Sequence, residues 1–159
     1  RLGDLVRFTS KDPLRMEFAG RLTGCLSTTQ ELTTHVEIQR AMEHALTKFG
    51  ATTVDYGCGA DVGVNGTSRS RYALFAEFEG QAPEPSAFAR AFDEGLCQEN
   101  RVYREHRRDD VGIFAPELTV LPGGSVKRFM SEIGNTSVQS KFPRILDDER
   151  KRILRSYAR

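Results

Sequence analysis

The order in which strand-like and helix-like stretches follow one another constrains the fold of this 159-residue chain more than any other feature. A first pair of strands is followed by a helix, two strands, two helices, one more strand and two final helices. Without the first pair, the helix–strand–strand–helix–strand order favours a split βαβ sheet with helices on one face. We therefore expect an α+β fold: a small mixed sheet of the split βαβ, ferredoxin-like type with helices packed on it, preceded by a β-hairpin.

Alternation, helical spacing and capping residues indicate the individual elements. Residues 5–9 and 14–18 alternate like the two strands of a hairpin. Thr34 and Glu37 form a capping-box pattern at a helix start, and Gly50 is typical of a helix end. Further strands are predicted at 52–58, 72–78 and 117–121, and further helices over 101–108 and at starts capped by Ser86, Ser125 and Asp147.

Length and composition narrow the class of protein. A chain of this length forms one domain or a large domain fragment and buries a core without needing disulfides. Three cysteines without a Cys-x-x-Cys motif are typical of a reduced, cytoplasmic protein. A net charge of +1 without an aromatic–basic stripe disfavours nucleic acid, and no apolar run approaches a membrane span. Residues 101–159 carry 13 Lys and Arg against 8 Asp and Glu, which either helps to hold a phosphate-bearing ligand or belongs to solvated helix faces.

The opening motif Arg1-Leu2-Gly3-Asp4 supplies the first candidate site residue. It leads straight into a strand without an initiator Met, which predicts that the chain begins inside a longer protein. A carboxylate after a glycine turn, at the mouth of a strand, can hold a vicinal diol because ionised Asp offers only acceptors. The alternative is that Asp4 is an ordinary turn residue.

A second candidate lies in the segment from Gln139 to Arg144. Lys141 precedes Phe142 and Pro143, and the proline fixes its own φ and biases Phe142 towards an extended shape. Such a rigid segment can present the Lys141 ammonium to a phosphate or carboxylate oxygen that gains negative charge during a reaction. The alternative is an ordinary solvent-exposed lysine.

Other reactive motifs are missing from the sequence. The three histidines are isolated from the cysteines, and no spacing predicts a metal site. There is no nucleophile elbow and no Walker-type phosphate loop, and we interpret residues 59–63 as a flexible turn. Cys25 and Cys97 stand in apolar surroundings, which favours core positions over nucleophiles.

Several short motifs form a recognisable series when their order and spacing are considered together. They are Arg1-Leu2-Gly3-Asp4, Phe18-Ala19-Gly20-Arg21, Asn100-x-x-Tyr103-x-x-x-Arg107, Pro116 before 117–121, Gly124-x-x-Lys127 and Gln139-x-Lys141-x-Pro143-Arg144. With them, essentially the whole chain resembles the C-terminal domain of the acyl-acid amido synthetases named after plant auxin-responsive proteins. That family belongs to the acyl-adenylate-forming superfamily that includes firefly luciferase.

This resemblance implies a role for three residues. Asp4 would accept hydrogen bonds from the ribose hydroxyls of ATP or AMP, and Arg21 would lie near the ribose or the interdomain hinge. Lys141 would balance charge on the α-phosphate and the attacking carboxylate. The family joins a carboxylic acid to AMP with the help of Mg²⁺ and then passes the acyl group to an amine, usually that of an amino acid.

The resemblance also implies how the chain is organised. Residues 1–159 would be a lid domain that swings between the two steps, with residues 1–21 as a hairpin and hinge region. Its partner would be its own large N-terminal adenylation domain, and alone it would be inactive. No nucleic-acid or membrane partner is expected.

One position departs from the family pattern. Aligned on Leu26-Ser27, a Lys found in many plant members falls at Leu32, and a leucine cannot replace an ammonium as a phosphate partner. Another basic residue substitutes, this chain handles the phosphates differently, or the register is off by a few residues. A different class of function also stays open: an independent ferredoxin-like module that binds a small ligand or a partner protein without catalysis.

Overall fold

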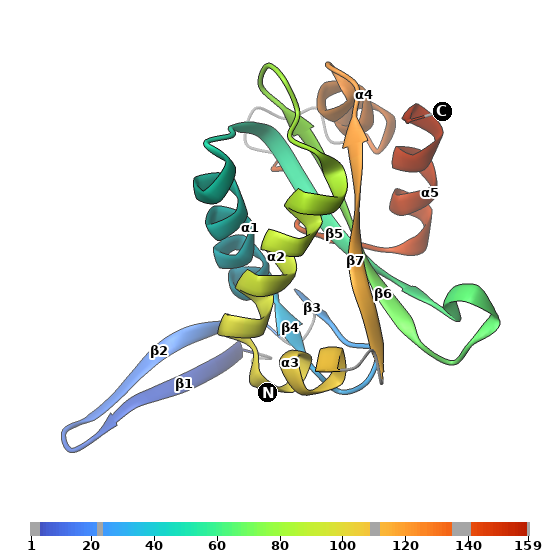
Figure 1. The fold of residues 1–159 in the computed structure, drawn as a ribbon. Helices are drawn as coiled ribbons and strands as arrows, with labels where there is room; N and C mark the ends of the chain where they lie inside the picture. Colours follow the sequence, from blue (N-terminus) through green and yellow to red (C-terminus); the bar gives the residue numbers. More distant parts are fainter. Residues whose placement is uncertain (1–3, 22–23, 109–111, 135–140, 159) are drawn as a thin grey trace.

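A four-stranded mixed sheet forms the centre of the fold (Figure 1). A computed structural model of the chain describes residues 4–21, 24–108, 112–134 and 141–158. The strands are β1 (Asp4–Lys11), β2 (Leu14–Arg21), β3 (Cys25–Leu26), β4 (Thr33–Thr34), β5 (Thr53–Val62), β6 (Ser70–Phe78), β7 (Ile113–Leu121) and β8 (Ile145–Leu146). The helices are α1 (His35–Phe49), the 3-10 helix η2 (Val64–Gly66), α2 (Pro85–Glu99), α3 (Arg101–Arg107), α4 (Ser125–Glu132) and α5 (Asp148–Tyr157). None of the helices in these ranges is long and apolar enough to cross a membrane.

The strand order of the central sheet is β7-β6-β5-β8. β5 and β6 are antiparallel, from Thr53 opposite Phe78 to Val62 opposite Ser70. β7 runs parallel to β6, and the short β8 runs parallel to β5. The predicted α+β class with a small mixed sheet is thus confirmed. The crossover from β6 to β7 through α2 and α3 joins neighbouring strands, with no strand inserted between them.

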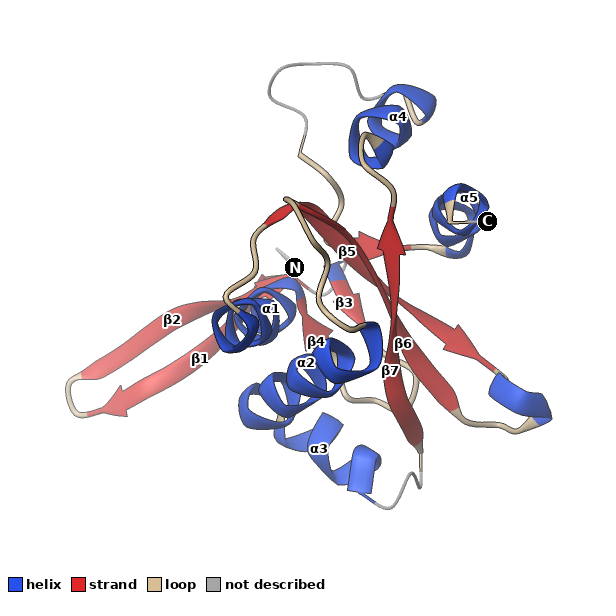
Figure 2. Ribbon diagram, turned by 45° about the horizontal axis from the view of Figure 1, so that its top comes forward, coloured by secondary structure: helices blue, strands red, loops and turns tan. Residues whose placement is uncertain are grey.

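Helices cover both faces of the sheet, whereas the sequence predicted them on one face (Figure 2). Successive side chains of β6 point to opposite faces. Tyr72 and Leu74 belong to the core shared with α1 and α2, whereas Ala73 and Phe75 belong to a second core with α4 and α5. The prediction of helices on one face is wrong because the order of elements does not determine which face of the sheet a C-terminal helix covers. A strand covered on both sides requires the continuous apolar run that β6 has.

β5 extends through the glycine-rich stretch that the sequence predicted as a loop. It runs to Val62, and Gly57 and Gly59 lie inside it beside β8. A Cβ on Gly57 would lie 2.6 Å from the carbonyl oxygen of Pro143, and one on Gly59 would lie 2.6 Å from that of Leu146. Glycine stands at these positions because a neighbouring segment approaches closely, and not because the chain turns there.

The N-terminus of α4 is capped by a residue distant in the sequence, whereas the sequence predicted Ser125 as the cap. Glu77 on β6 is buried and accepts hydrogen bonds from the backbone N–H groups of Gly124 and Val126, each at 2.7 Å. A carboxylate at this position satisfies free N–H groups and complements the helix dipole. The local caps lie at Thr34 with Glu37 (α1), at Glu84 and not the predicted Ser86 (α2), and at Asp147 (α5).

The predicted hairpin is present as a separate two-stranded sheet of β1 and β2, which projects from the body of the molecule (Figure 1). At its base the chain continues to β3 and β4, where Cys25 pairs with Thr34. This short pair encloses residues 27–32, of which 27–31 are polar, and leads the chain to the start of α1. The hairpin, this polar stretch and the N-terminus of α1 therefore meet at one junction.

Candidate functional site

The base of the hairpin makes two predicted site residues neighbours. Asp4 is the cross-strand partner of Arg21, and Leu5 is the partner of Gly20. The side chains of all four residues lie outside the described part of the structure, so this pairing concerns the backbone. Two positions that stand far apart in the sequence thus lie directly opposite each other across the hairpin.

Lys141 is exposed and stands immediately before a firmly anchored segment. Phe142 is buried in the second core, where its ring centroid lies 5.0 Å from that of Phe129. The backbone N–H of Cys58 on β5 donates to the carbonyl oxygen of Arg144 at 2.9 Å. The backbone that follows Lys141 is therefore held against the sheet and α4, which fixes the point from which the flexible Lys141 side chain emerges.

The side chain of Arg144 fixes this segment to β5. Its guanidinium forms an ion pair with Asp55 and donates to the carbonyl oxygen of Tyr56 at 2.7 Å. Burial raises the pKa of the Tyr56 hydroxyl above its usual value, although the Arg144 charge opposes this rise. Because Arg144 is satisfied by these groups, the exposed cation of the segment is Lys141.

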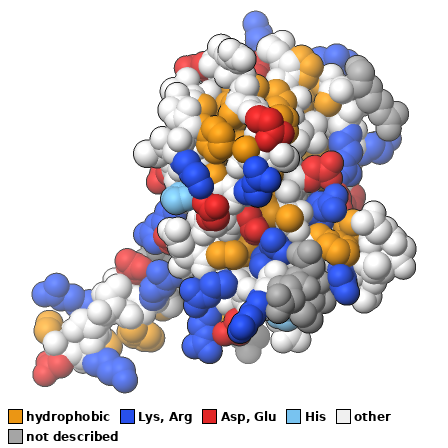
Figure 3. Space-filling view, in the orientation of Figure 1, with side chains coloured by type: hydrophobic (Ala, Val, Ile, Leu, Met, Phe, Trp, Pro, Cys, Tyr) orange, Lys and Arg blue, Asp and Glu red, His pale blue; other side chains and the backbone are white. Residues whose placement is uncertain are grey.

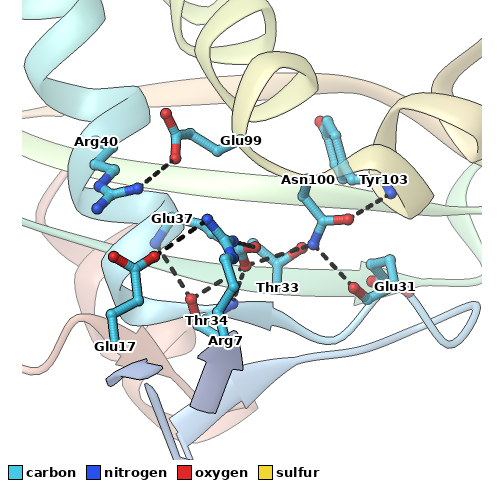
Figure 4. A network of polar contacts seen from close by, with 10 residues as sticks. All are labelled: Arg7, Glu17, Glu31, Thr33, Thr34, Glu37, Arg40, Glu99, Asn100 and Tyr103. Atoms are coloured by element: carbon cyan, nitrogen blue, oxygen red, sulfur yellow. Dashed lines mark hydrogen bonds and ion pairs between the residues drawn. The ribbon is translucent and has the colours of Figure 1, made fainter. Parts of the chain in front are cut away.

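A buried polar network joins the 27–34 stretch to the starts of α1 and α3 (Figure 4). We call Glu31, Thr33, Glu37, Tyr72 and Asn100 the junction network. The Asn100 Nδ2 atom donates to the carbonyl oxygen of Glu31 at 2.9 Å and lies 3.3 Å from Thr33 Oγ1 and 3.4 Å from Glu37 Oε2. The Tyr72 hydroxyl lies 2.8 Å from Glu31 Oε1 and 2.9 Å from Thr33 Oγ1. Side chains from β6, α1 and α3 thereby hold the polar stretch in one conformation.

Glu31 is the buried carboxylate of the junction network, with only 2% of its surface exposed. The backbone N–H groups of Thr28 and Thr29 donate to its carboxylate, the shortest contact being 2.7 Å from Thr29. Burial by itself raises the pKa of Glu31, but hydrogen bonds from Thr29, its own backbone, Tyr72 and Thr28 together hold that pKa below its usual value. The carboxylate is therefore ionised near neutral pH and organises the surrounding turn.

The backbone on both sides of Glu31 lies in the left-handed region. Gln30 has φ of 74° and Leu32 has φ of 45°. Such conformations cost a non-glycine residue on the order of 1 kcal/mol or more, and they concentrate at functional sites. Leu32, where the resemblance places a Lys in many plant members, is 45% exposed.

The sequence analysis missed this network. Asn100 was quoted only as part of a motif, and residues 27–31 were assigned neither a structure nor a role. The one local signal is the pair of threonines before Glu31, since Ser and Thr groups often fold a turn around an acceptor. The contacts of Glu31 with Tyr72 and Asn100 depend on the tertiary fold.

Thiol and metal chemistry find no support in the described ranges. None of the three cysteines, which all lie in the described ranges, forms a disulfide. Burial raises the pKa of Cys58, and it raises the pKa of Cys97 to about 11, so neither is an activated thiolate near neutral pH. No group of three or more His, Cys, Asp or Glu side chains in these ranges could hold a metal ion.

Comparison with known proteins shows the family. Residues 36–150, well over half of the chain, match the GH3 family C-terminal domain. This chain belongs to the GH3 family. Lys141 and the junction-network residues Glu37, Tyr72 and Asn100 lie inside the matched stretch of this GH3 domain, whereas the hairpin lies before it. No curated protein gives a significant match.

Two solved GH3 structures share the fold. A structure described as GH3.15 acyl acid amido synthetase superposes with a TM-score of 0.75 at 22% sequence identity, covering 99% of this chain and 30% of that chain. A structure of AtGH3.15 acyl acid amido synthetase in complex with 2,4-DB gives a TM-score of 0.71 with the same identity and coverage. The GH3 domain described here therefore spans about 30% of the length of these synthetases, as expected for one domain of a larger enzyme.

Proposed function

We propose that this GH3 domain is the C-terminal lid of an ATP-dependent acyl acid amido synthetase. The match of residues 36–150 to the GH3 family C-terminal domain carries this proposal. The complete enzyme would join a carboxylic acid to AMP, release pyrophosphate and transfer the acyl group to an amine, such as that of an amino acid. The partner of this domain would be the larger N-terminal adenylation domain of the same enzyme.

We assign Lys141 to the adenylation step. As a carboxylate oxygen attacks the α-phosphorus and the bond to pyrophosphate breaks, the Lys141 ammonium would balance the negative charge on the phosphate and the carboxylate. The anchors at Phe142 and Arg144 support this assignment. A cation on a fixed backbone can be delivered to the phosphate without a further loss of backbone freedom, although its side chain still has to be ordered.

We assign Asp4 and Arg21 to the sugar of the nucleotide. The Asp4 carboxylate would accept hydrogen bonds from the two ribose hydroxyls, and its cross-strand partner Arg21 would lie near the ribose. Mg²⁺ would neutralise phosphate charge in the complete enzyme. Because the described residues offer no cluster of carboxylates for it, we assign it no ligand in this chain.

Leu32 cannot supply a positive charge for phosphate binding at the position where the resemblance places a Lys. Its turn is fixed by Glu31, but the exposed side chain that it presents is apolar. An apolar group gives no charge stabilisation to a phosphate. The positive charge needed in this member would therefore come from Lys141 and from the larger domain.

Acid-dependent exchange of pyrophosphate into ATP tests the function. The complete enzyme is expected to catalyse this exchange with at least one member of a panel of aromatic, indole and fatty acids, and the 159-residue chain alone is expected not to catalyse it. Exchange by the isolated chain would contradict the assignment of the chemistry to the larger domain. Failure of the complete enzyme with every acid, without acyl-adenylate in rapid-quench samples, would contradict the synthetase function.

A further inference from the structure

Glu77 is a buried carboxylate to which the proposed reaction assigns no role. On the face of the molecule seen in Figure 3, Asp and Glu side chains lie at the surface among Lys and Arg side chains. Glu77, near the end of β6, is by contrast only 5% exposed, and among the described residues no cation forms an ion pair with it. A buried charge without a compensating partner is costly, so other groups must stabilise this carboxylate.

The N-terminus of α4 stabilises it. Glu77 lies opposite Leu121 where β6 and β7 pair, and residues 122–124 connect β7 to α4. The backbone N–H of Gly124 donates to Glu77 Oε1 and that of Val126 donates to Oε2, each at 2.7 Å. The positive end of the helix dipole adds to these two hydrogen bonds. Both carboxylate oxygens therefore bind the same helix end.

α4 depends on Glu77 because it has no cap of its own. Its N-cap residue Gly124 has φ of 84° and no side chain that could accept a hydrogen bond, and its first turn contains no acidic residue. The other half of α4 is held by α5: the Tyr157 hydroxyl donates to Glu132, and the guanidinium carbon of Arg128 lies 4.4 Å from the centroid of the Tyr157 ring. Glu77 is thus the side chain that fixes the N-terminus of α4 on the sheet.

α4 in turn contacts the segment that carries Lys141. Phe129 on α4 is fully buried and its ring packs against that of Phe142, the residue directly after Lys141. Because side chains in a close-packed core cannot shift independently, a displacement of α4 moves Phe142 and the backbone beside it. Arg144 holds the same segment from β5, so the two anchors act on opposite sides of Pro143.

From these contacts we propose that Glu77 is a positioning residue for the adenylation step and acts through Lys141. By capping α4, it holds Phe129 against Phe142, and this contact fixes the point from which the Lys141 side chain emerges. Glu77 itself touches no substrate. This inference rests on the proposed function, since it needs the role assigned to Lys141. Because only adenylation uses that lysine, the effect of Glu77 is confined to the same step.

The rates of the two half-reactions of the complete enzyme test this proposal. Glu77→Ala removes both acceptor oxygens, whereas Glu77→Gln keeps the size of the side chain and one acceptor oxygen. We expect adenylation to fall about tenfold or more in the Ala variant and less in the Gln variant, because a small displacement of a catalytic group is enough for such a loss. Aminolysis of preformed acyl-adenylate should stay unchanged. Glu79→Ala, at an exposed position directly after β6, is the control and should change neither rate.

A double variant separates positioning from a general structural role. If Glu77 acts through Lys141, Glu77→Ala should slow adenylation by no more than about twofold when Lys141 is already replaced by Ala. Circular dichroism verifies that each variant is folded at the assay temperature, and Glu77→Gln replaces Glu77→Ala in the cycle if the Ala variant does not fold. An equal loss in both backgrounds, or an equal loss in both half-reactions, would overturn the proposal, since Glu77 would then only support the fold.

Amide hydrogen exchange reads the contact through α4 without any activity. In the Glu77 variants of the complete enzyme, the amides of α4 and of residues 142–146 should exchange faster, while those of α1 stay the same. Unchanged exchange at residues 142–146 would also overturn the proposal, because α4 would then not hold that segment. Failure of the original enzyme to form acyl-adenylate from any acid rejects the proposed function, and the hydrogen exchange still decides separately whether Glu77 anchors the segment.

Discussion

The guanidinium carbon of Arg144 lies 4.0 Å from the centroid of the Tyr56 ring. This stacking, together with the ion pair to Asp55, holds the segment that carries Lys141 against β5. Two residues from distant parts of the sequence thus determine where the proposed catalytic lysine emerges.

Replacement of Arg144 by Ala should therefore destabilise the domain. We expect a loss of about 1–2 kcal/mol in the free energy of unfolding, since a cation–π contact and a charge-assisted hydrogen bond are removed together. Urea denaturation of the 159-residue chain measures it. Arg152→Ala, at an exposed position on α5, is the matched control and should change the free energy by less than about 0.5 kcal/mol. Equal effects of the two substitutions would show that Arg144 does not hold the segment.

Gly57→Ala should displace the same segment from the opposite side. The new Cβ would lie 2.6 Å from the carbonyl oxygen of Pro143, so the backbone after Lys141 has to move. Overpacking of this kind costs about 1–3 kcal/mol, measurable by the same denaturation. Gly123→Ala is the control, because nothing lies within 4 Å of its added Cβ. A Gly57 variant as stable as the Gly123 variant would contradict the close packing.

Glu31 should make stability fall on acidification. Its pKa is lowered in the folded state, so its contribution is complete above the ordinary value of 4.5 and is lost as the pH falls through the lower folded value. Glu31→Gln should weaken this pH dependence and should cost about 1–3 kcal/mol at pH 7, where the donors lose a charged acceptor. Thermal unfolding between about pH 3 and pH 7 follows both effects. If acid affected the variant as strongly as the original protein, Glu31 would not contribute to this slope.

Lys141→Ala should impair the first half-reaction of the complete enzyme selectively. Loss of one preorganised charge donor lowers an enzymatic rate by about 10²–10³-fold, so adenylation should fall by that order. Aminolysis of preformed acyl-adenylate should change little, and the melting temperature of the exposed variant should stay unchanged. Lys48→Ala, which removes an exposed lysine of α1, is the control. Equal loss in both half-reactions would remove Lys141 from its proposed role.

Asp4→Ala should weaken the binding of ATP to the complete enzyme. Removal of an ionised acceptor for two hydroxyls costs about 1.5–3 kcal/mol, which corresponds to a decrease in affinity of tenfold or more. Isothermal titration with a non-hydrolysable ATP analogue measures it. Asp12→Ala, at the turn of the same hairpin, should leave the affinity unchanged. An unaltered affinity in the Asp4 variant would reject the ribose contact.

Local interactions let the sequence determine most elements by itself. The Thr34–Glu37 capping box, the Asp147 cap and the apolar run of β6 were all predicted from neighbouring residues and are present. The hairpin and the family were also predicted from the sequence, because turn residues and motif spacing are properties of the linear chain. The roles of Asp4, Arg21 and Lys141 stay predictions.

Other features were decided only by the tertiary structure, because they depend on which segments meet. Residues 59–63 look like a turn in the sequence, but pairing with β6 continues β5 through Gly59 to Val62. Only the close approach of Pro143 and Leu146 explains why glycine stands at positions 57 and 59. In the same way, the sequence shows an apolar run over residues 72–76 of β6, but only packing shows that helices cover both of its faces. The burial of Glu31 is the sharpest case. Its charge is acceptable in the interior because Thr28, Thr29 and Tyr72 converge on it. The two threonines are a local signal, but the contact with Tyr72 on β6 depends on the tertiary fold.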